Sequence, residues 1–511
     1  MTFSFAFLAP LVLLAVAALS GGRAGRRPGG PARWSEAAAA AAGALVVLGL
    51  VQLAVSGPAA AFGLKAGPVG LTMALLVSFI GWVVMRYSRS YLDGEAREGR
   101  FHGLMLATLA AILVFALSGD VWLLLLSAIA VGLTLRRLLL FYPERAEARR
   151  AATKFALVWH GGDAALFGAA VLLTSRFGTG ALDLLAARAT QEGLGVAGHL
   201  AMGLVVLAAL LKTAAFPLHG WLTEVMEAPT PVSALLHAGI INSGGVLLIQ
   251  ASDLVQLSPG AMAALVMAGG LTALFGAAVM LAQSAVKTAL AWSTVAQMGF
   301  MLLQCGLGLW ALALLHILAH SLYKAHAFLS SGGAVAAVAQ IRRPGPVAVP
   351  DLGAVLRSFG LALAIYAGIA LIFTLVLGPK TAQALALGAM LIFGVAYLVA
   401  QGLADLAPAE LTRRTVTASL AAAVAYFSFQ AVAQKIWGPG LPPAPVPGAL
   451  EWALIVLAIL SFGAVALAQA LFPLWAHHPA VAGLRVHLAN GLYLNALLDR
   501  AIGGFRAARE G

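Results

Sequence analysis

The sequence contains little charge and almost no cysteine. Only 10% of its 511 residues are charged, 61% are hydrophobic, and the mean hydropathy is +0.95. A soluble globular protein has about 25% charged and about 45–50% apolar residues. This shortage of charge excludes a soluble enzyme, and the excess of apolar residues excludes a disordered chain. The single cysteine, Cys305, excludes an internal disulfide framework and a multi-cysteine metal site. A polytopic membrane protein remains.

Motifs for nucleotide, flavin and iron–sulfur binding are also missing. The chain has no Walker loop, no GxGxxG after a predicted strand and no set of cysteines. We therefore expect no cofactor and no metal on this chain.

Long apolar runs are abundant instead. A helix needs about 20 apolar residues to cross the hydrocarbon core of a bilayer. Fifteen segments satisfy this requirement, so the sequence predicts an all-α polytopic membrane protein with about fifteen transmembrane helices. Their expected ranges are 3–20, 37–57, 67–86, 102–119, 120–141, 156–175, 199–218, 231–250, 260–283, 284–306, 308–331, 357–377, 381–403, 415–437 and 449–472.

The net charge of +12 reflects the orientation of these helices rather than affinity for nucleic acid. With the N-terminus outside and the C-terminus in the cytoplasm, 24 of the 31 basic residues lie in cytoplasmic segments. Such a bias is typical of cytoplasmic loops. Two basic residues, Lys212 and Lys324, remain inside predicted spans. The tail from 473 onward has apolar and basic positions at helical spacing, so it either lies along the cytoplasmic interface or packs on the bundle.

Lys212 stands in the stretch VVLAALLKTAAFPLHGW, five residues before Pro217. Proline breaks a helix, and broken helices beside a lysine line wet cavities in transporters. Ionisable groups inside a membrane are usually functional, so we prefer the interpretation that Lys212 exchanges a proton. The alternative is that its ammonium group extends to the interface from the end of the helix.

His316, His320 and Lys324 recur every four residues in a later span. Residues at this spacing share one helical face, and histidine exchanges protons near neutral pH. The pattern predicts a proton path along the helix. The alternative is a metal site at His316 and His320, as in a membrane metalloenzyme, although a lysine on the same face opposes a bound cation.

Three further polar residues are candidates for the ion path. His237 lies inside a predicted span and is equally compatible with packing and with function. Asp163 is a natural counter-charge for a buried lysine. Glu224, together with Glu227, follows the predicted helix break and is either a proton entrance or part of a salt bridge.

These residues carry a resemblance. The stretch LLKTAAFPLHGWLTEVMEAPTPVSALLHAGIINSGGVLLI (210–249) is very similar to the signature of the proton-conducting membrane transporter family. This family includes the antiporter-like subunits of respiratory complex I and the large subunits of Mrp-type cation/proton antiporters. VKTALAWSTVAQMGFM (286–301) and HILAHSLYKAHAFLSSGG (316–333) resemble its next conserved blocks.

The family resemblance implies two inverted five-helix repeats with broken helices around a polar axis. It places Lys212, His237, His316, His320 and Lys324 on that axis. The implied divisions are N-terminal helices in 1–101, a first repeat in 102–250, a second in 260–403, C-terminal helices in 404–472 and an amphipathic cytoplasmic tail in 473–511.

The chain departs from the complex I pattern at two positions. Ile129 stands about where those subunits have a fifth-span glutamate that pairs with the broken-helix lysine. Either Asp163 takes over part of that role, or this half does not conduct. Lys380 is a possible second-half lysine.

A narrower resemblance explains these departures. LRRLLLFYPERAEARRAATKF, KAHAFLSSGG and HLANGLYLNALLDR look like segments of the DabB subunits of the DAB inorganic-carbon accumulation system. This resemblance implies a multi-pass protein of the bacterial inner membrane that conducts H⁺ or Na⁺. It also implies a soluble DabA-like partner, similar to a zinc β-carbonic anhydrase, which hydrates CO2 to bicarbonate. Zinc would belong to that partner, which would dock on the basic cytoplasmic segments 136–154, 342–357 and the tail. The alternatives are a proton-pumping complex I-like subunit and an Mrp-type antiporter subunit.

Overall fold

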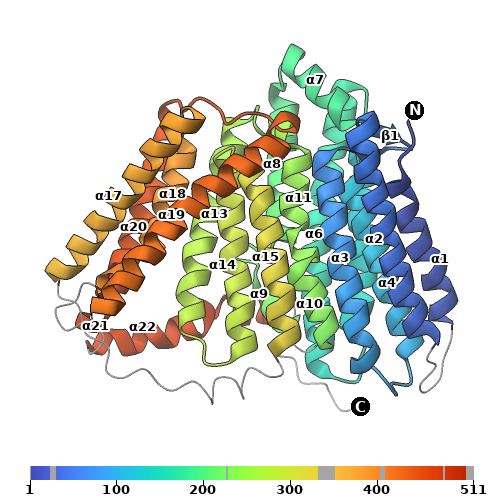
Figure 1. The fold of residues 1–511 in the computed structure, drawn as a ribbon. Coiled ribbons are helices and arrows are strands. Elements are labelled where there is room, and N and C mark those ends of the chain that lie inside the picture. The colour runs from blue at the N-terminus through green and yellow to red at the C-terminus, as the bar shows by residue number, and fades with distance from the viewer. Residues whose placement is uncertain are drawn as a thin grey trace.

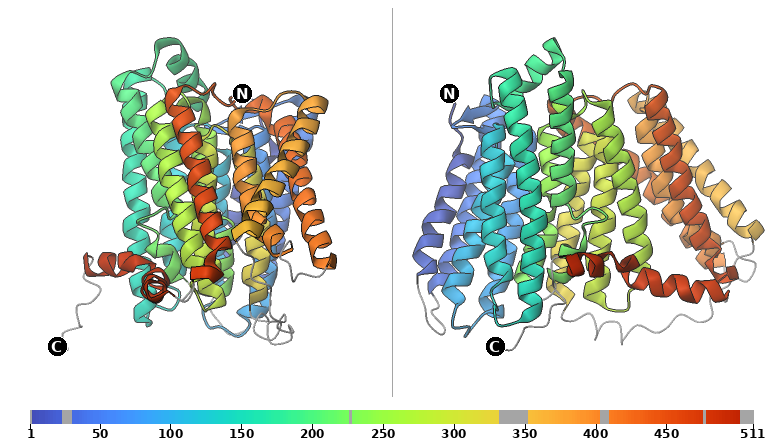
Figure 2. Two further views of the ribbon diagram at one scale, coloured as in Figure 1. Left: turned by 90° about the vertical axis from the view of Figure 1, so that its left-hand side faces the viewer. Right: turned by 180° about the vertical axis from the view of Figure 1, so that it is seen from behind.

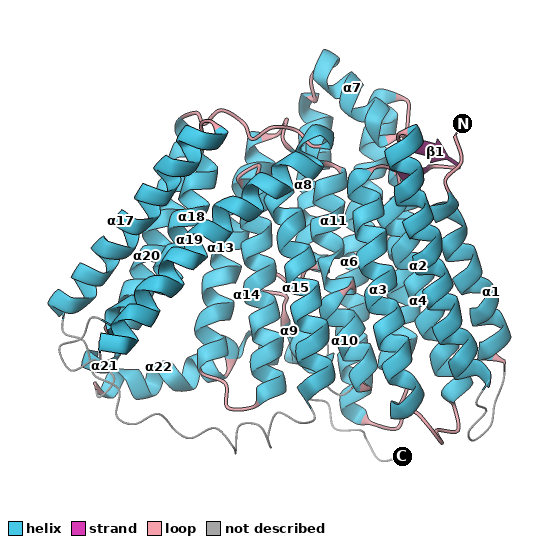
Figure 3. Ribbon diagram, in the orientation of Figure 1, coloured by secondary structure: helices cyan, strands magenta, loops and turns pink. Residues whose placement is uncertain are grey.

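The computed structural model describes residues 2–22, 30–225, 228–331, 352–402, 409–475 and 478–501. Almost all of them are helical (Figure 3). One small antiparallel hairpin, β1 (Ala59–Ala61) with β2 (Leu64–Ala66), was not expected. Strands of three residues are too short to produce a recognisable alternation of polar and apolar side chains.

Long helices run side by side through the molecule and make up the bundle (Figure 1). They are α1 (Ala9–Gly21, preceded by the 3-10 helix η1, Phe5–Leu8), α2 (Gly30–Ser56), α3 (Pro68–Tyr91), α4 (Glu98–Leu117), α5 (Val121–Leu139), α6 (Ala146–Phe177), α8 (Gly195–Lys212), α10 (Thr230–Ala238) with α11 (Ser243–Gln250), α13 (Pro259–Leu281), α14 (Val286–Gly306), α15 (Trp310–Ser330), α17 (Leu352–Leu377), α18 (Ala382–Gly402), α19 (Ala409–Trp437) and α20 (Ala449–Ala470).

Short helices connect or cap these long ones. They are α7 (Leu182–Glu192), α9 (Gly220–Glu224), η3 (Ile240–Asn242), α12 (Ser252–Val255), η5 (Gly438–Gly440), α21 (Phe472–Trp475), α22 (Pro479–Ala489), η6 (Gly491–Tyr493) and α23 (Leu494–Ala501).

Within the described residues, eleven helices are long and apolar enough to cross a membrane. Two shorter apolar helices, Phe5–Gly21 and Ala382–Val395, accompany them. These helices confirm the all-α polytopic class. The count of fifteen spans, the two inverted repeats and the division of the chain at 101, 250, 403 and 472 stay predictions.

The two ends of the bundle differ. The β1–β2 hairpin and α7 lie at one end, whereas α22 crosses the opposite end nearly at right angles to the long helices (Figures 1 and 2). The chain begins at the end that carries the hairpin, and α22 lies at the opposite end. Which end faces the cytoplasm stays a prediction from the charge bias.

The helix that carries Lys212 is broken, as Pro217 predicts. Helix α8 stops at Lys212, and Ala214 adopts a left-handed conformation with a φ of 51°. The Phe216 N–H, which has lost its place in a helix, donates to Thr272 Oγ1 of α13 at 3.1 Å. A buried backbone donor needs such a partner at membrane depth.

A second break, which the sequence analysis missed, interrupts the next span. Helix α10 ends at Ala238, Gly239 follows as its C-cap, and η3 separates it from α11. Asn242 in η3 donates from Nδ2 to Ser321 Oγ of α15 at 2.9 Å. The break therefore presents a buried polar side chain to the helix that carries the predicted histidine stripe.

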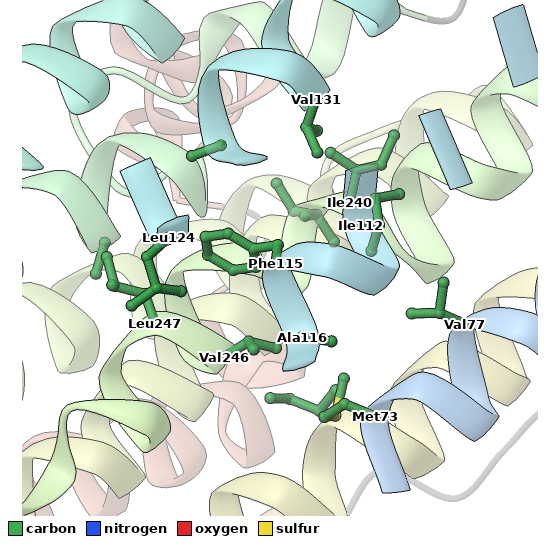
Figure 4. Close-up of a cluster of buried hydrophobic side chains, with 14 of the residues drawn as sticks. Met73, Val77, Ile112, Phe115, Ala116, Leu124, Val131, Ile240, Val246 and Leu247 are labelled. Atoms are coloured by element: carbon green, nitrogen blue, oxygen red, sulfur yellow. The ribbon is translucent and has the colours of Figure 1, made fainter. Parts of the chain in front are cut away.

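The apolar core around these breaks is tightly filled. Figure 4 shows Phe115 and Ile112 of α4 together with Leu124 of α5, Val77 of α3 and Leu247 of α11. All of them are buried. This packing holds α11 against α3, α4 and α5.

Glycines allow α13 and α14 to approach closely. A Cβ added at Gly269 would lie 2.5 Å from the Leu303 backbone nitrogen, and one at Gly276 would lie 2.7 Å from that of Ala296. At the adjacent Gly270 a Cβ would meet no atom within 4 Å. Small residues permit such approach between membrane helices.

We expect Gly269→Ala to destabilise the protein and Gly270→Ala to leave it unchanged or slightly more stable. The first substitution overpacks a helix interface, which costs about 1–3 kcal/mol, whereas the second adds helix propensity in open space. Thermal unfolding of the purified proteins in detergent measures the difference. Equal melting temperatures would contradict this account of the α13–α14 contact.

Candidate ion-translocation site

A buried ion pair joins the end of α8 to the middle of α6. Lys212 Nζ donates to Asp163 Oδ1 at 2.5 Å. The Lys212 side chain is fully buried, and that of Asp163 is 7% exposed. A buried charge requires a partner of opposite sign. The structure thus places at Lys212 the counter-charge that the sequence analysis proposed.

Trp159 completes the surroundings of the ammonium group. Lys212 Nζ lies 4.1 Å from the centroid of the Trp159 ring, which places a cation over an aromatic face. Trp159 is held in turn by donation from its Nε1 to the Ala128 carbonyl of α5 at 3.0 Å. Helix α5 therefore positions the indole that contacts Lys212. Ile129, the next residue of α5 after Ala128, is partly buried against the apolar core.

A third polar group, His160, also contacts the pair. Its Nδ1 donates to Asp163 Oδ2 at 2.7 Å, and 35% of its side chain is exposed. The sequence analysis missed this residue. The signal was available, because His160 and Asp163 are three residues apart and so share one face of a helix.

Glu224 lies in a separate cluster, near the end of the bundle that α22 crosses. The Lys154 ammonium group contacts Glu224 Oε1 at 2.5 Å and Asp499 Oδ1 at 2.6 Å. It also donates to Asn495 Oδ1 at 2.7 Å. These contacts are those of the salt-bridge alternative, and a proton entrance at Glu224 stays a prediction. Glu227 lies outside the described residues.

Asp499 and Asn495 belong to α23, so part of the tail packs on the bundle. Helix α22, by contrast, exposes Leu484 and Val486 at the end of the bundle. The packing alternative is confirmed for α23. The position of α22 relative to a lipid interface stays a prediction.

Aromatic side chains separate this cluster from the Lys212–Asp163 pair. Phe155 and Trp159 follow Lys154 along α6, and both rings contact Trp221 of α9, with centroids 5.3 and 6.4 Å apart. All three side chains are almost fully buried. They fill the space along α6 between the two charged groups.

The second group of predicted residues gathers around the first half of α14. Lys324 Nζ donates to the Leu290 carbonyl at 2.8 Å and also to Ser293 Oγ. His237 Nδ1 contacts Thr294 Oγ1 at 3.0 Å, and its ring stacks on Phe328 of α15. Both Lys324 and His237 are fully buried.

His316 and His320 continue this group along α15, with ring centroids 6.1 Å apart. His316 Nδ1 donates to Gln304 Oε1 at 2.9 Å. Among the described residues, the buried Nε2 atoms of His237 and His320 have no hydrogen-bond partner. These two nitrogens are thus the unpartnered polar atoms of the second group.

The hydroxyl of Thr294 lies between His237 and the backbone of α14. Thr294 Oγ1 is 3.0 Å from His237 Nδ1 and 3.0 Å from the Leu290 carbonyl oxygen. The side chain of Thr294 therefore positions the His237 ring. Thr294 and Gln304 are polar partners that sequence reasoning did not single out, because each stands in an apolar span without an ionisable neighbour.

The structure does not join the two groups directly. Among the described contacts, no ion pair or hydrogen bond links Lys212 or Asp163 to His237 or Lys324. Lys380 lies away from both groups, between α17 and α18, where it lines a cavity of 310 Å³ with Gln430 and Gln434.

A metal site at His316 and His320 lacks further ligands in the described part of the chain. There, no group of three or more His, Cys, Asp or Glu side chains is placed to hold a metal ion.

Comparisons with known proteins show which family the chain resembles. A family model described as "NADH:quinone oxidoreductase/Mrp antiporter, TM" matches residues 118–344, and one for the N-terminus of complex I chain 5 matches residues 53–102. A probable inorganic carbon transporter subunit, DabB2 of Halothiobacillus neapolitanus, is 37% identical over 461 residues, which cover 86% of this chain and 80% of that protein. The chain belongs to this antiporter-like family.

Other members of the antiporter-like family are similar over shorter stretches. A probable inorganic carbon transporter subunit DabB of Hydrogenovibrio crunogenus is 45% identical over 269 residues, or 52% of each chain. Subunit L of the NADH-quinone oxidoreductase of Mycobacterium tuberculosis is 33% identical over 407 residues, 78% of this chain and 62% of that one. The chain is therefore a multi-pass, cation-translocating subunit with DabB-like sequence.

Solved structures share the fold of the antiporter-like family. An Mrp complex from Dietzia sp. superposes with a TM-score of 0.65 at 23% identity, covering 99% of this chain and 60% of that one. A membrane-bound sulfane sulfur reductase, an archaeal respiratory membrane complex, gives a TM-score of 0.59 at 19% identity, covering 91% and 77%.

We expect Asp163→Asn to lower the free energy of unfolding by about 3–5 kcal/mol, because it leaves the buried Lys212 ammonium group unpaired. Adding Lys212→Met should restore much of this loss. The matched control is Asp183→Asn, which breaks the exposed Lys65–Asp183 pair of 2.6 Å and should cost less than about 1 kcal/mol. Equilibrium unfolding in detergent measures all three variants, and equal losses for the two single variants would refute the buried-pair interpretation.

Proposed function

We propose that this chain is the cation-conducting membrane subunit of an inorganic-carbon accumulation complex. It conducts H⁺ or Na⁺ down its gradient, and this flow energises the conversion of CO2 to bicarbonate by a soluble zinc partner that resembles a β-carbonic anhydrase. The observation that carries the proposal is the buried Lys212–Asp163 pair in a chain whose relatives include DabB proteins.

The pair can act as a charge switch. In the ionised state, Lys212 is held to Asp163 at 2.5 Å. A cation or proton that neutralises Asp163 removes the attraction that holds the ammonium group in its apolar site. Lys212 then has reason to release its own proton or to move, because a buried charge without a partner is costly.

Asp163 pairs with Lys212 in place of the glutamate that α5 lacks. Ile129 offers no charge, yet Lys212 is paired from α6 instead. This supports conduction through the first half of the protein by a pair that differs from the complex I pattern. Lys324, with His237, His316 and His320, provides the acceptors and donors of the second group.

The partner would dock at the end of the bundle that bears exposed arginines. Arg136 and Arg137 in the last turn of α5 and Arg145 and Arg149 at the start of α6 are exposed there. Such a basic surface favours an acidic face on the partner. No zinc site is proposed on this chain, because zinc chemistry belongs to the partner.

The second candidate is a subunit of a redox-driven proton pump, which the similarity to subunit L of the Mycobacterium tuberculosis enzyme favours. A cation/proton antiporter subunit is the related alternative, because the chain shares its fold with an Mrp complex. The deciding experiment is rescue of a carbonic-anhydrase-null bacterial host at ambient CO2 by this chain with its candidate partner. The carbon-uptake proposal requires rescue that depends on both proteins and disappears with an uncoupler.

In that assay we expect Lys212→Ala and His316→Ala to abolish growth at ambient CO2 while the complex still assembles. Each variant removes a titratable group of one polar cluster. The control is Lys65→Ala. Lys65 is an exposed lysine of the β1–β2 hairpin, outside both polar clusters, so cells with this variant should grow normally. Affinity co-purification of the partner checks assembly, and normal growth of both site variants would rule out the proposal.

A further inference from the structure

A cavity of 310 Å³ lies at the end of the bundle that carries the β1–β2 hairpin (Figure 1). Its walls are the ends of α17 and α19, the start of α15, and two connections, 378–381 and 441–444. Every residue of 441–448 is partly or fully exposed. Exposed irregular backbone does not occur within the hydrocarbon core of a bilayer, so the cavity opens toward water.

The cavity has one positive charge and lacks a negative one. Lys380, in the connection between α17 and α18, lines it, whereas none of the described Asp and Glu side chains does. With the described residues, Lys380 makes no ion pair and no hydrogen bond. Hollows lined by charge of one sign concentrate ions of the opposite sign. The charge of this cavity therefore favours an anion.

Two amide side chains line the cavity beside this lysine. Gln430 and Gln434 are four residues apart on α19 and so share one face of the helix. The Oε1 atom of Gln430 is buried and has no hydrogen-bond partner among the described residues. A buried acceptor without a donor is costly, and such an atom calls for a partner. An anion that carries a hydroxyl group would supply that donor.

The first turn of α15 adds backbone N–H groups to the wall of the cavity. Trp310, Ala311 and Leu312 line it and are almost fully buried. In the described part of the chain, no side chain caps this helix at Leu309. The first N–H groups of a helix lack partners within the helix and favour a negative oxygen. This turn therefore adds to the positive field of Lys380.

The loop that closes the cavity is held by two further glutamines. Gln256 Nε2 donates to the Pro443 carbonyl at 2.7 Å, and Gln383 Nε2 of α18 donates to the Pro445 carbonyl at 2.6 Å. Gln256 Oε1 also accepts from Trp310 Nε1 at 2.8 Å. The loop and the first turn of α15 thus share one support. Binding sites are usually formed in advance by walls of this kind.

We propose that this cavity binds a small oxyanion that carries a hydroxyl group, namely bicarbonate. The Lys380 ammonium group binds an anionic oxygen, and the hydroxyl group donates to Gln430 Oε1. The choice of bicarbonate rests on the carbon-uptake function proposed above, whereas the oxyanion site itself does not. Binding places a negative charge at the start of α15, the helix that carries His316, His320 and Lys324.

The test is isothermal titration calorimetry of the full chain in phosphatidylcholine nanodiscs, with bicarbonate and with nitrate. Nitrate has the charge and the planar shape of bicarbonate but no hydroxyl group, so wild type should bind bicarbonate about 10-fold more tightly. Lys380→Gln should weaken the binding of both anions at least about 10-fold, because it removes a charged donor. The matched control is Lys435→Gln, an exposed lysine of α19 outside the cavity lining, which should bind as wild type does.

Gln430→Leu separates the hydroxyl contact from the charge, because it should abolish the preference for bicarbonate while nitrate still binds. Equal affinities of wild type and Lys380→Gln would overturn the site, and equal affinities of wild type for the two anions would overturn the hydroxyl contact. Loss of bicarbonate binding when phosphatidylglycerol is added to the nanodisc would assign the cavity to a lipid headgroup instead. Binding is measured without ion flow, so its failure leaves the rescue assay as a separate test of the proposed function.

Discussion

A charge inside a membrane protein needs a partner, and the arrangement of this molecule around Lys212 follows from that requirement. The ammonium group is fully buried at the end of α8 and meets the Asp163 carboxylate and the face of Trp159. Each partner comes from α6, and α5 supports the indole through the Ala128 carbonyl. Three helices are thus fixed relative to one another by one side chain, and the break after Lys212 leaves that side chain at a free helix end.

The second polar group satisfies the same requirement without a carboxylate. Lys324 is bound by a backbone carbonyl and a serine hydroxyl of α14, and the neighbouring Thr294 holds His237. Neutral acceptors stabilise an ammonium group less than an anion does. The two lysines therefore differ in the charge of their partners, an anion at Lys212 and neutral oxygens at Lys324.

Composition and spacing predicted the fold class and most of the residues in these groups. Ionisable side chains are rare in apolar spans, so Lys212, Asp163, His237 and the stripe on α15 were easy to find. The partners were harder. Thr294, Gln304 and Trp159 are ordinary residues for a membrane helix, and only the approach of a second helix gives them a role. The break at η3 was missed for a related reason, since Gly239 and Asn242 are common in helices whose neighbours supply the lost hydrogen bonds.

Lys154 is bound by two helices at once, by Glu224 of α9, the short helix after the break, and by Asp499 of α23, the last helix that the structure describes. Removing one partner from a buried ion pair costs about 3–5 kcal/mol. A shift of α9 away from α6 therefore removes one of the two carboxylates that neutralise Lys154, whereas α23 supplies the other. Asn495 Nδ2 of α23 also donates to Glu224 Oε1. The position of α23 is thus coupled to that of α9, the segment that follows the helix break after Lys212.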